Sequence, residues 1–138
     1  MSAKDKFHDQ VKRALIKEQW TVTDDPLEVT SEGRTFVVDL GAERLILADR
    51  GIERIAVEVK SFLNASAITD FYGALGQFST YRLALRREDP ERVLYLAVPE
   101  DAYETFFRSD FIQIAIQEFQ LLLIVYEPQQ EVIVQWIN

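Results

Sequence analysis

The sequence predicts a mixed α/β protein in which helices cover both faces of a sheet, and three observations indicate this. Apolar residues recur at helical spacing near the start of the chain and again after residue 66. Between them lie runs rich in β-branched and aliphatic residues that alternate as strands do. A later run, RVLYLAVP (92–99), is apolar almost throughout, as in a central strand covered on both faces. Helices and strands that follow one another in this way form layered α/β sandwiches.

Length and composition narrow the class of protein. The chain has 138 residues, so we expect one domain over residues 1–138. It has no cysteine, which excludes disulfides and thiolate metal sites and suits a reducing cytoplasm. The start of the chain has no apolar h-region, and the longest apolar stretch, LLLIVY, is far too short to span a bilayer. We therefore expect a cytoplasmic protein with no membrane partner.

The net charge and the histidine content exclude further classes of protein and of site. The net charge of −8 argues against a protein that coats nucleic acid by charge alone. It leaves room for an enzyme that holds divalent cations and touches DNA through a small basic patch. The single histidine, His8, argues against a histidine-rich zinc site and against a Ser-His-Asp triad elsewhere in the chain.

The first half of the chain predicts one helix followed by paired strands. We expect the helix from Lys4 to Gln19, where the apolar residues keep helical spacing: Phe7, Val11, Ala14 and Leu15. The segment TVTDDPLEV (21–29) ends it, with Pro26 in a turn. Residues 35–49 predict one long or broken strand, in which Gly41 could mark a bulge. The DRG segment (49–51) predicts a hairpin turn, and residues 53–62 predict the return strand.

The second half adds a long helix, a central strand and a hairpin. Residues 66–88 predict a helix closed by Pro90, with an apolar stripe made of Ile68, Phe71, Tyr72, Leu75, Phe78 and Leu85. Residues 103–119 predict structure that is wholly or partly helical, and residues 121–138 predict a hairpin that turns at 127–130. The expected order is α-β-β-β-α-β-α-β-β. Trp136 and Ile137 could cap the core, or their strand could be an edge that pairs with another chain in a homo-oligomer.

Two charged residues inside an apolar strand indicate a site. In VEVKSF (57–62), Glu58 and Lys60 stand two positions apart, so both side chains leave from the same face of the strand. Ile55, Val57 and Val59 then face the opposite way. A buried carboxylate needs a partner. Lys60 alone could be that partner in a partly exposed ion pair, worth roughly 0–1 kcal/mol, whereas a chemical site needs a second acid.

Asp39 is the candidate second acid. The hairpin brings it antiparallel and close to the Glu58 strand, and aspartate is a poor strand former. The structural alternative is a bulge-associated or turn-capping aspartate beside Gly41. By spacing alone Asp49 is a rival, but it lies in the DRG turn, where aspartate is expected for backbone reasons.

Two converging carboxylates form a site for a hard cation. Asp39 and Glu58, with a backbone carbonyl that we assign to Val59, would suit Mg²⁺ or Mn²⁺, which take oxygen ligands. Lys60 beside them can position a metal-bound water or help to deprotonate it, and can offset developing negative charge. Such a set of groups suits phosphodiester hydrolysis.

The long helix offers two further candidates. Gln77 and Tyr81 stand at i and i+4 on one helical face, near the small or polar residues Asp70, Gly73 and Ala74. These would let the helix approach a site closely. The structural alternative is a solvated glutamine and a core tyrosine with its hydroxyl at the surface.

Contact with DNA also needs positive charge. Basic residues cluster at the end of the long helix and along the first helix: Arg82, Arg86, Arg87 and Arg92, and Lys12, Arg13 and Lys17. Arginines in the last turn of a helix also favour its dipole, which explains them equally well. Because the chain is acidic overall, we expect any DNA affinity to be modest, sensitive to salt and dependent on a partner subunit.

These residues follow the order of a known pattern. Asp39 followed by Glu58-Val59-Lys60 resembles the D…(E/D)xK signature of the PD-(D/E)XK nuclease superfamily, although Val38 stands where the pattern has proline. QFSTY (77–81) resembles the QxxxY motif of the RecB-type branch. Five segments together resemble the XisH family, the fdxN-element excision controlling factors of cyanobacteria, over nearly the whole chain: FHDQVKRALIKEQW, VVDLGAE, IAVEVKSF, ALGQFSTY and LYLAVPEDAYETFF.

The resemblance implies both a fold and partners. The fold is a restriction-endonuclease-like αβββαβ core, with a mixed sheet flanked by helices and a C-terminal β-hairpin. The partners are DNA, through site-specific excision of a DNA element, and a protein of the XisI family. The superfamily often has an acid in its first helix that reaches the metal, and the counterparts available here are His8 and Asp9.

Two functions remain open. The first is a metal-dependent endonuclease in which Asp39 and Glu58 hold the metal, Lys60 controls the water, and Gln77 orients Lys60 or the phosphate. The second is a non-catalytic regulator that uses the nuclease fold as a DNA- or protein-binding platform for a site-specific recombinase. Clustered acids favour the first function, since a platform does not need them. The negative net charge and the lack of a strong basic face favour the second.

Overall fold

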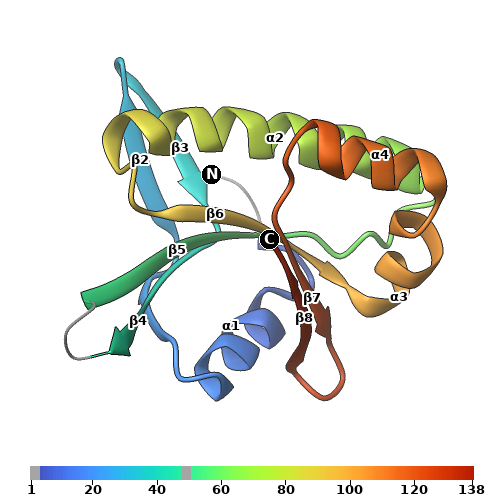
Figure 1. The fold of residues 1–138 in the computed structure, drawn as a ribbon, viewed down its shortest axis with the longest axis horizontal. Helices are drawn as coiled ribbons and strands as arrows, with labels where there is room; N and C mark the ends of the chain where they lie inside the picture. Colours follow the sequence, from blue (N-terminus) through green and yellow to red (C-terminus); the bar gives the residue numbers. More distant parts are fainter. Residues whose placement is uncertain (1–3, 48–50) are drawn as a thin grey trace.

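The computed structural model describes residues 4–47 and 51–138, and its centre is a six-stranded mixed sheet. The strand order is β1-β4-β5-β6-β7-β8. Strands β5 and β6 and strands β6 and β7 pair in parallel, while the other neighbours are antiparallel. Helix α1 covers one face of the sheet, and α2 and α4 cover the other (Figure 1). The predicted mixed sheet flanked by helices, with a terminal hairpin, is therefore confirmed.

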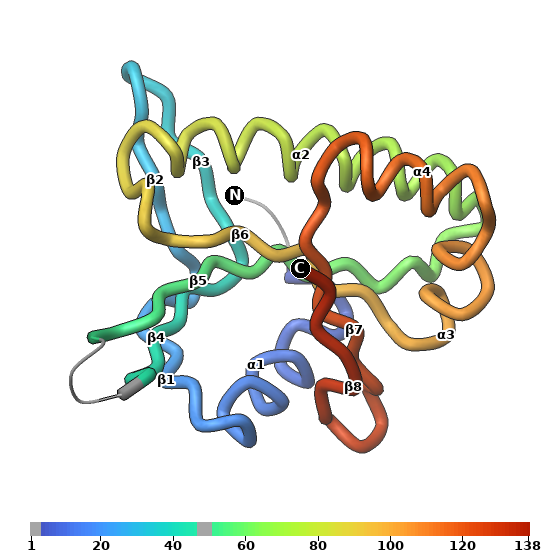
Figure 2. Tube along the Cα trace, viewed as in Figure 1, coloured from blue at the N-terminus to red at the C-terminus, as the bar shows by residue number. Residues whose placement is uncertain are grey.

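The first half of the chain contains more strands than the sequence predicted. Its elements are α1 (His8–Lys17), β1 (Thr21–Asp24), β2 (Leu27–Ser31), β3 (Arg34–Val38), β4 (Leu40–Leu47) and β5 (Gly51–Val59). The sequence predicted a turn at Pro26, which lies between β1 and β2, but it predicted no strand in residues 21–29, whereas β1 joins the edge of the sheet and β2 pairs with β3. The β2–β3 hairpin packs beside α2 (Figure 2). β2 alternates buried and exposed residues, the pattern of a half-covered strand.

The predicted long strand is broken, and the break lies at Asp39, between β3 and β4. Gly41 does not form the bulge itself: the register shift is on β1, between Val22 and Asp24, opposite Gly41. A Cβ at Gly41 would lie 3.1 Å from Arg92 Nη1 and 3.1 Å from Asp24 Oδ1, so this glycine permits a close approach of neighbouring side chains. Most of the predicted DRG turn, including Asp49, lies outside the described residues, although Leu47 and Gly51 do pair across it.

The second half follows the prediction. Its elements are α2 (Ala67–Glu88), β6 (Val93–Pro99), α3 (Glu100–Ala102), the π-helical turn η1 (Tyr103–Phe107), α4 (Asp110–Glu118), β7 (Leu123–Glu127) and β8 (Val132–Ile137). Ser66 caps α2, and its Oγ accepts a hydrogen bond from the N–H of Thr69. The predicted apolar stripe of α2 was partly wrong. Ile68 is 37% exposed and Tyr72 is 65% exposed, because the helix is covered only on the side that faces the sheet.

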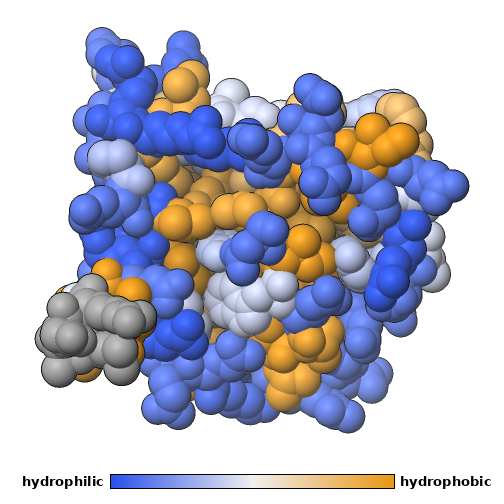
Figure 3. Space-filling model, viewed as in Figure 1, coloured by the Kyte–Doolittle hydropathy of each residue, from blue (hydrophilic) through white to orange (hydrophobic). Residues whose placement is uncertain are grey.

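The sheet divides the buried side chains into two layers. Ile55, Val57 and Val59 pack with the residues of α1, whereas Ala56 packs with the residues of α2. Strand β5 therefore alternates as predicted, and Glu58 and Lys60 leave on the α2 side. In the view of Figure 3, polar side chains frame an apolar strip between α2 and β6. None of the helices in the described residues is long and apolar enough to cross a membrane.

The last strand completes the core. Trp136 stacks on Trp20 with ring centroids 5.8 Å apart, and it packs nearly perpendicular to the Tyr95 ring with centroids 5.1 Å apart. Its indole N–H donates to Glu18 Oε1 at 3.0 Å. Trp136 thus caps the core, as one of the two alternatives predicted. β8 is also an edge strand of the sheet, so pairing with a second copy stays a prediction.

Candidate active site

One small cavity gathers all the predicted site residues. Its volume is about 100 Å³, and its lining residues are Asp5, Asp39, Glu58, Val59, Lys60, Gln77 and Tyr81. They come from the segment before α1, the break between β3 and β4, the end of β5, and one face of α2. The structure therefore brings these groups together, while their chemical roles stay predictions.

Asp39 and Glu58 are held by reciprocal hydrogen bonds. The backbone N–H of Val59 donates to Asp39 Oδ2 at 2.7 Å, and the backbone N–H of Asp39 donates to Glu58 Oε1 at 3.3 Å. Asp39 can do this because it stands between two strands. In a strand, the N–H and C=O of one residue point to the same side. The carbonyl of Val59 is therefore on the side where Asp39 lies.

Lys60 places a positive charge beside the two acids. Its Nζ lies 3.4 Å from Glu58 Oε2, and its side chain is 27% exposed, whereas that of Glu58 is 6% exposed. Its backbone is fixed from two sides: its N–H donates to the carbonyl of Ala97, and its carbonyl accepts the hydroxyl of Tyr126. The ammonium group of Lys60 therefore lies between the buried carboxylate of Glu58 and the solvent.

The environment raises the pKa of both Asp39 and Glu58. Burial, and next the charge of Asp39, raise the pKa of Glu58 to about 8, although Lys60 acts in the opposite direction. Burial also raises the pKa of Asp39, against the hydrogen bond from Val59 and the charge of His8. Two carboxylates in such a place need a proton or a cation between them near neutral pH.

Gln77 and Tyr81 both reach the cavity from α2. The Tyr81 ring also packs edge-on against Phe36, with ring centroids 6.1 Å apart, so the tyrosine has a structural contact as well. Burial raises the pKa of Tyr81, and the charges of Glu58 and Asp39 add to this effect, so its hydroxyl keeps its proton. Gln77 is exposed on the helix surface and is free to meet a ligand.

Of the two candidates in the first helix, His8 approaches the acids and Asp9 does not. His8 is buried, with its Nε2 2.7 Å from Asp25 Oδ1 and its Nδ1 3.9 Å from Asp39 Oδ1. Asp9 is exposed and pairs with Lys4 at 3.6 Å. Burial acts to raise the pKa of Asp25, but hydrogen bonds from Lys12 and His8 outweigh it, and the pKa is lowered. Asp25 therefore orients His8 as a charged acceptor.

Sequence reasoning missed Asp5. The predicted helix included this residue, but α1 begins at His8, and Asp5 lies just before it. Its Oδ1 accepts a hydrogen bond from the N–H of Phe7, and its Oδ2 accepts one from the N–H of Ser61, each at 3.0 Å. Asp5 thus ties the start of the first helix to the end of β5. An acid just before a helix is a capping signal, but it did not indicate this long-range contact.

Most of the predicted basic residues pair with acids or carbonyls of the same chain, several of them on the surface. Arg82 donates to the carbonyls of Phe119 and Gln120 at the end of α4, and Arg92 binds Asp89 and the carbonyl of Ile55. The remaining pairs are Arg87 with Glu32, Lys12 with Asp25, Arg13 with Glu131, and Lys17 with the carbonyl of Gln130. Arg86 has no such partner among residues 4–47 and 51–138.

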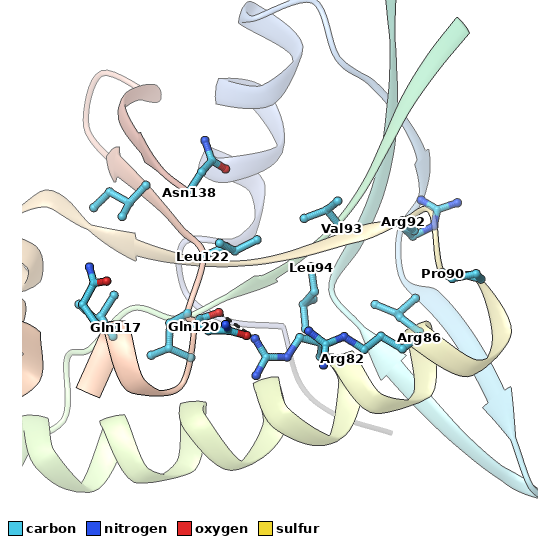
Figure 4. A pocket seen from close by; sticks show the side chains of 14 residues that line it. Arg82, Arg86, Pro90, Arg92, Val93, Leu94, Gln117, Gln120, Leu122 and Asn138 are labelled. Atoms are coloured by element: carbon cyan, nitrogen blue, oxygen red, sulfur yellow. Dashed lines mark hydrogen bonds between the residues drawn. The ribbon is translucent and has the colours of Figure 1, made fainter. Parts of the chain in front are cut away.

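Three of these basic residues, Arg82, Arg86 and Arg92, line a cavity that is separate from the acids. It has a volume of about 510 Å³ and lies between the C-terminal ends of α2 and α4. Arg82 reaches toward Gln120 there, with Arg86 beside it, while Arg92 turns away (Figure 4). This cavity shares no lining residue with the one that contains Asp39 and Glu58, so the two are distinct sites.

Asp39, Glu58 and the carbonyl of Val59 offer oxygen ligands that suit a hard cation, but they are too few to fill its coordination shell. Within the described parts of the chain, no group of three or more His, Asp or Glu side chains could hold a metal by itself. Two carboxylates and a carbonyl are a smaller set, and Mg²⁺ commonly completes such a set with waters. The buried, mutually repelling acids are the feature that favours a cation here.

Comparisons with known proteins agree on the family. The family model described as XisH protein matches residues 1–134. The chain is similar to the crystal structure of an XisH family protein from Nostoc punctiforme, with 52% identity and a TM-score of 0.88 over 97% of this chain and 100% of that one. It is equally similar, at 52% identity, to an fdxN element excision controlling factor protein from Anabaena variabilis, with a TM-score of 0.87 over 96% of this chain and 98% of that one. No curated protein matches. A match over nearly the whole chain to the family model, together with relatives sharing half of the residues, means that the chain belongs to the XisH family.

Proposed function

We propose that this XisH-family chain takes part in the excision of a DNA element, and that it does so as a metal-dependent endonuclease of the PD-(D/E)XK type. The name of the similar protein from Anabaena variabilis supports the link to excision. The observation that carries the nuclease proposal is the convergence of Asp39, Glu58 and Lys60 on one cavity that Gln77 and Tyr81 also line.

In this proposal Asp39, Glu58 and the carbonyl of Val59 hold Mg²⁺ or Mn²⁺. The bound ion would lower the pKa of a water and neutralise charge that develops on the phosphodiester. The burial of the two acids supports a cation here, because burial raises the pKa of both carboxyl groups and a bound cation would favour their ionised forms. The reciprocal hydrogen bonds hold both carboxylates in place before any ligand arrives.

The other residues act on the water and the phosphate. Lys60 keeps its ammonium 3.4 Å from Glu58 and remains partly exposed, so it can hold an attacking water and offset negative charge. Gln77 is an exposed donor and acceptor at the cavity rim, suited to orient Lys60 or a phosphate oxygen. Tyr81 keeps its proton, so it serves as a hydrogen-bond donor and not as a base.

A nicking assay on supercoiled DNA tests the proposal. The parent chain is expected to nick DNA with Mg²⁺ or Mn²⁺ and to stop when the metal is chelated. Lys60→Ala and Glu58→Gln should each lower the rate by at least about a hundredfold, as expected for groups that act in the transition state. Asp9→Asn is the matched control, because Asp9 is an exposed acid outside the cavity.

A second candidate is the non-catalytic platform, and a specific observation favours it. Nearly all the predicted DNA-contacting cations pair with acids or carbonyls of the same chain, and these pairs would have to open before the cations contact phosphates on an acidic protein. In this reading, a partner of the XisI type supplies the missing DNA contacts. If the parent chain does not nick DNA with either metal, yet changes the DNA binding of such a partner, the platform replaces the nuclease.

A further inference from the structure

A second cavity opens beside the acids. It has a volume of about 400 Å³ and shares Asp5, Lys60 and Gln77 with the small cavity that holds Asp39 and Glu58. From there it extends along α2 past Gly73 to Asp70 and Asn64. Because the two cavities share three lining residues, they are direct neighbours, and a ligand that binds at the acids lies beside the second one.

The wall that α2 contributes has no side chain at its middle position. Asp70, Gly73 and Gln77 are spaced three and four residues apart, so they stand on one helical face. A Cβ placed on Gly73 would meet nothing within 4 Å. The middle of this wall is therefore open, and its two ends are polar.

The polar side chains of the cavity determine which chemical groups can bind in it. Asp70 Oδ1 accepts a hydrogen bond from the side-chain amide of Asn64 at 2.9 Å, while Oδ2 is buried and has no partner in the described part of the chain. An ionised carboxylate has acceptor capacity for several donors, and rotation about its terminal torsion exchanges the two oxygens. Asp5 adds a second acid. These two acids favour a group that carries N–H donors, and Lys60 is the cation of the same lining, on the side shared with the cavity of Asp39 and Glu58.

We propose that this cavity is a subsite for the base of an unpaired nucleotide next to the scissile phosphate, with Asp70 accepting a hydrogen bond from an amino group on the base. The position beside a scissile phosphate rests on the proposed nuclease function, whereas the binding of the base does not. A base inside a duplex is stacked and reaches a side cavity only when it is unpaired or turned out of the stack. The substrate class is therefore DNA that is single-stranded or branched at the cut. Cytosine, whose amino group suits a carboxylate, fits better than thymine, which lacks one.

Matched variants of two glycines test the cavity. Gly73→Leu fills it, whereas Gly76→Leu makes the same change on α2 outside the cavity, and a Cβ at either position meets nothing within 4 Å. Binding is measured by fluorescence anisotropy with labelled oligo-dC and oligo-dT single strands, with Ca²⁺ in place of Mg²⁺, so the readout does not need cleavage. Gly73→Leu should weaken single-strand binding about tenfold and Gly76→Leu should not.

Asp70→Asn tests the recognition of the base. The parent chain is expected to bind oligo-dC about tenfold more tightly than oligo-dT, and the variant should lose most of this preference. Equal affinity for both strands, unchanged by Gly73→Leu, overturns the subsite. If the parent chain nicks DNA while the two glycine variants behave alike, the subsite alone is wrong. If it does not nick DNA but the Asp70-dependent preference is present, the subsite stands and hydrolysis is wrong.

Discussion

The backbone N–H of Val59 donates a 2.7 Å hydrogen bond to Asp39 Oδ2, which ties the break between β3 and β4 to the end of β5. In return, Glu58 accepts from the N–H of Asp39. Each acid is thus held by the backbone of the other acid's segment. This reciprocal bonding places two carboxylates side by side in a buried position, at a cost in electrostatic free energy that the rest of the site must offset.

Asp39→Asn should lower the affinity for a divalent cation. The variant keeps an oxygen that can accept from Val59 but removes one of the two charges, so we expect the Mn²⁺ affinity to fall at least about tenfold while the fold is kept. Titration calorimetry with Mn²⁺ measures it. Asp9→Asn is the control and should bind as the parent does. Equal affinity in all three chains would remove Asp39 from the metal site.

Stability should depend on pH through Glu58. Its pKa is raised to about 8 in the folded chain, above its ordinary value of 4.5, so the folded state holds more protons than the unfolded state between these values. The free energy of unfolding therefore falls as pH rises through this range, by about 2 kcal/mol or more. Urea unfolding at pH 5, 6.5 and 8 without metal measures it.

The matched variants for this prediction are Glu58→Gln and Glu118→Gln. Glu58→Gln should flatten the pH dependence and make the chain more stable at pH 8, because no charge is then buried. Glu118 is an exposed acid on α4, and its variant should follow the parent. A parent chain whose stability rises from pH 5 to pH 8 would contradict the raised pKa.

Lys60→Met should separate metal binding from hydrolysis. The ammonium lies 3.4 Å from Glu58 and favours its ionised form, so without it the pKa of Glu58 should rise further. We expect Mn²⁺ binding to persist, with its onset shifted to higher pH, while nicking is lost. Calorimetry and nicking at pH 7 and pH 9 measure the two effects. Nicking at the parental rate would show that Lys60 has only a structural role.

Asp5→Ala should destabilise the fold as well as the site. Asp5 accepts hydrogen bonds from the backbone of Phe7 and Ser61, and both N–H groups would lose their partner. We expect a loss of about 1–3 kcal/mol in the free energy of unfolding. Urea unfolding measures it, with Asp101→Ala, an exposed acid on α3, as the control. Asp5→Asn, which keeps one acceptor oxygen, should recover about half of the loss.

Arg82 and Arg86, which both line the cavity of about 510 Å³, should behave differently when they are replaced. Arg82 satisfies two carbonyls at the end of α4, so Arg82→Met should cost about 1–2 kcal/mol of stability. Arg86→Met should leave stability within about 0.5 kcal/mol, as is usual for exposed residues. Thermal unfolding compares the two variants. If Arg86→Met alone weakens DNA binding at low salt, Arg86 is a phosphate contact and Arg82 is a helix cap.

The sequence predicted the elements with regular periods well. The alternation in 53–62 places Glu58 and Lys60 on one face, and the helical spacing in 66–88 places Gln77 and Tyr81 together. It failed at β1 and β2, which are short strands in a segment that contains a proline and two adjacent aspartates. It also misjudged Ile68 and Tyr72, because periodicity gives the width of an apolar stripe but not how much of it a neighbour covers.

By itself, the sequence determined which residues share a face, because side-chain direction follows from the local backbone period. Only the tertiary structure decided that Asp5 reaches the end of β5, that His8 and not Asp9 approaches Asp39, and that most of the basic residues are already paired. These contacts join residues far apart in the chain. They depend on how the whole sheet closes around α1 and α2, which no local pattern of residues encodes.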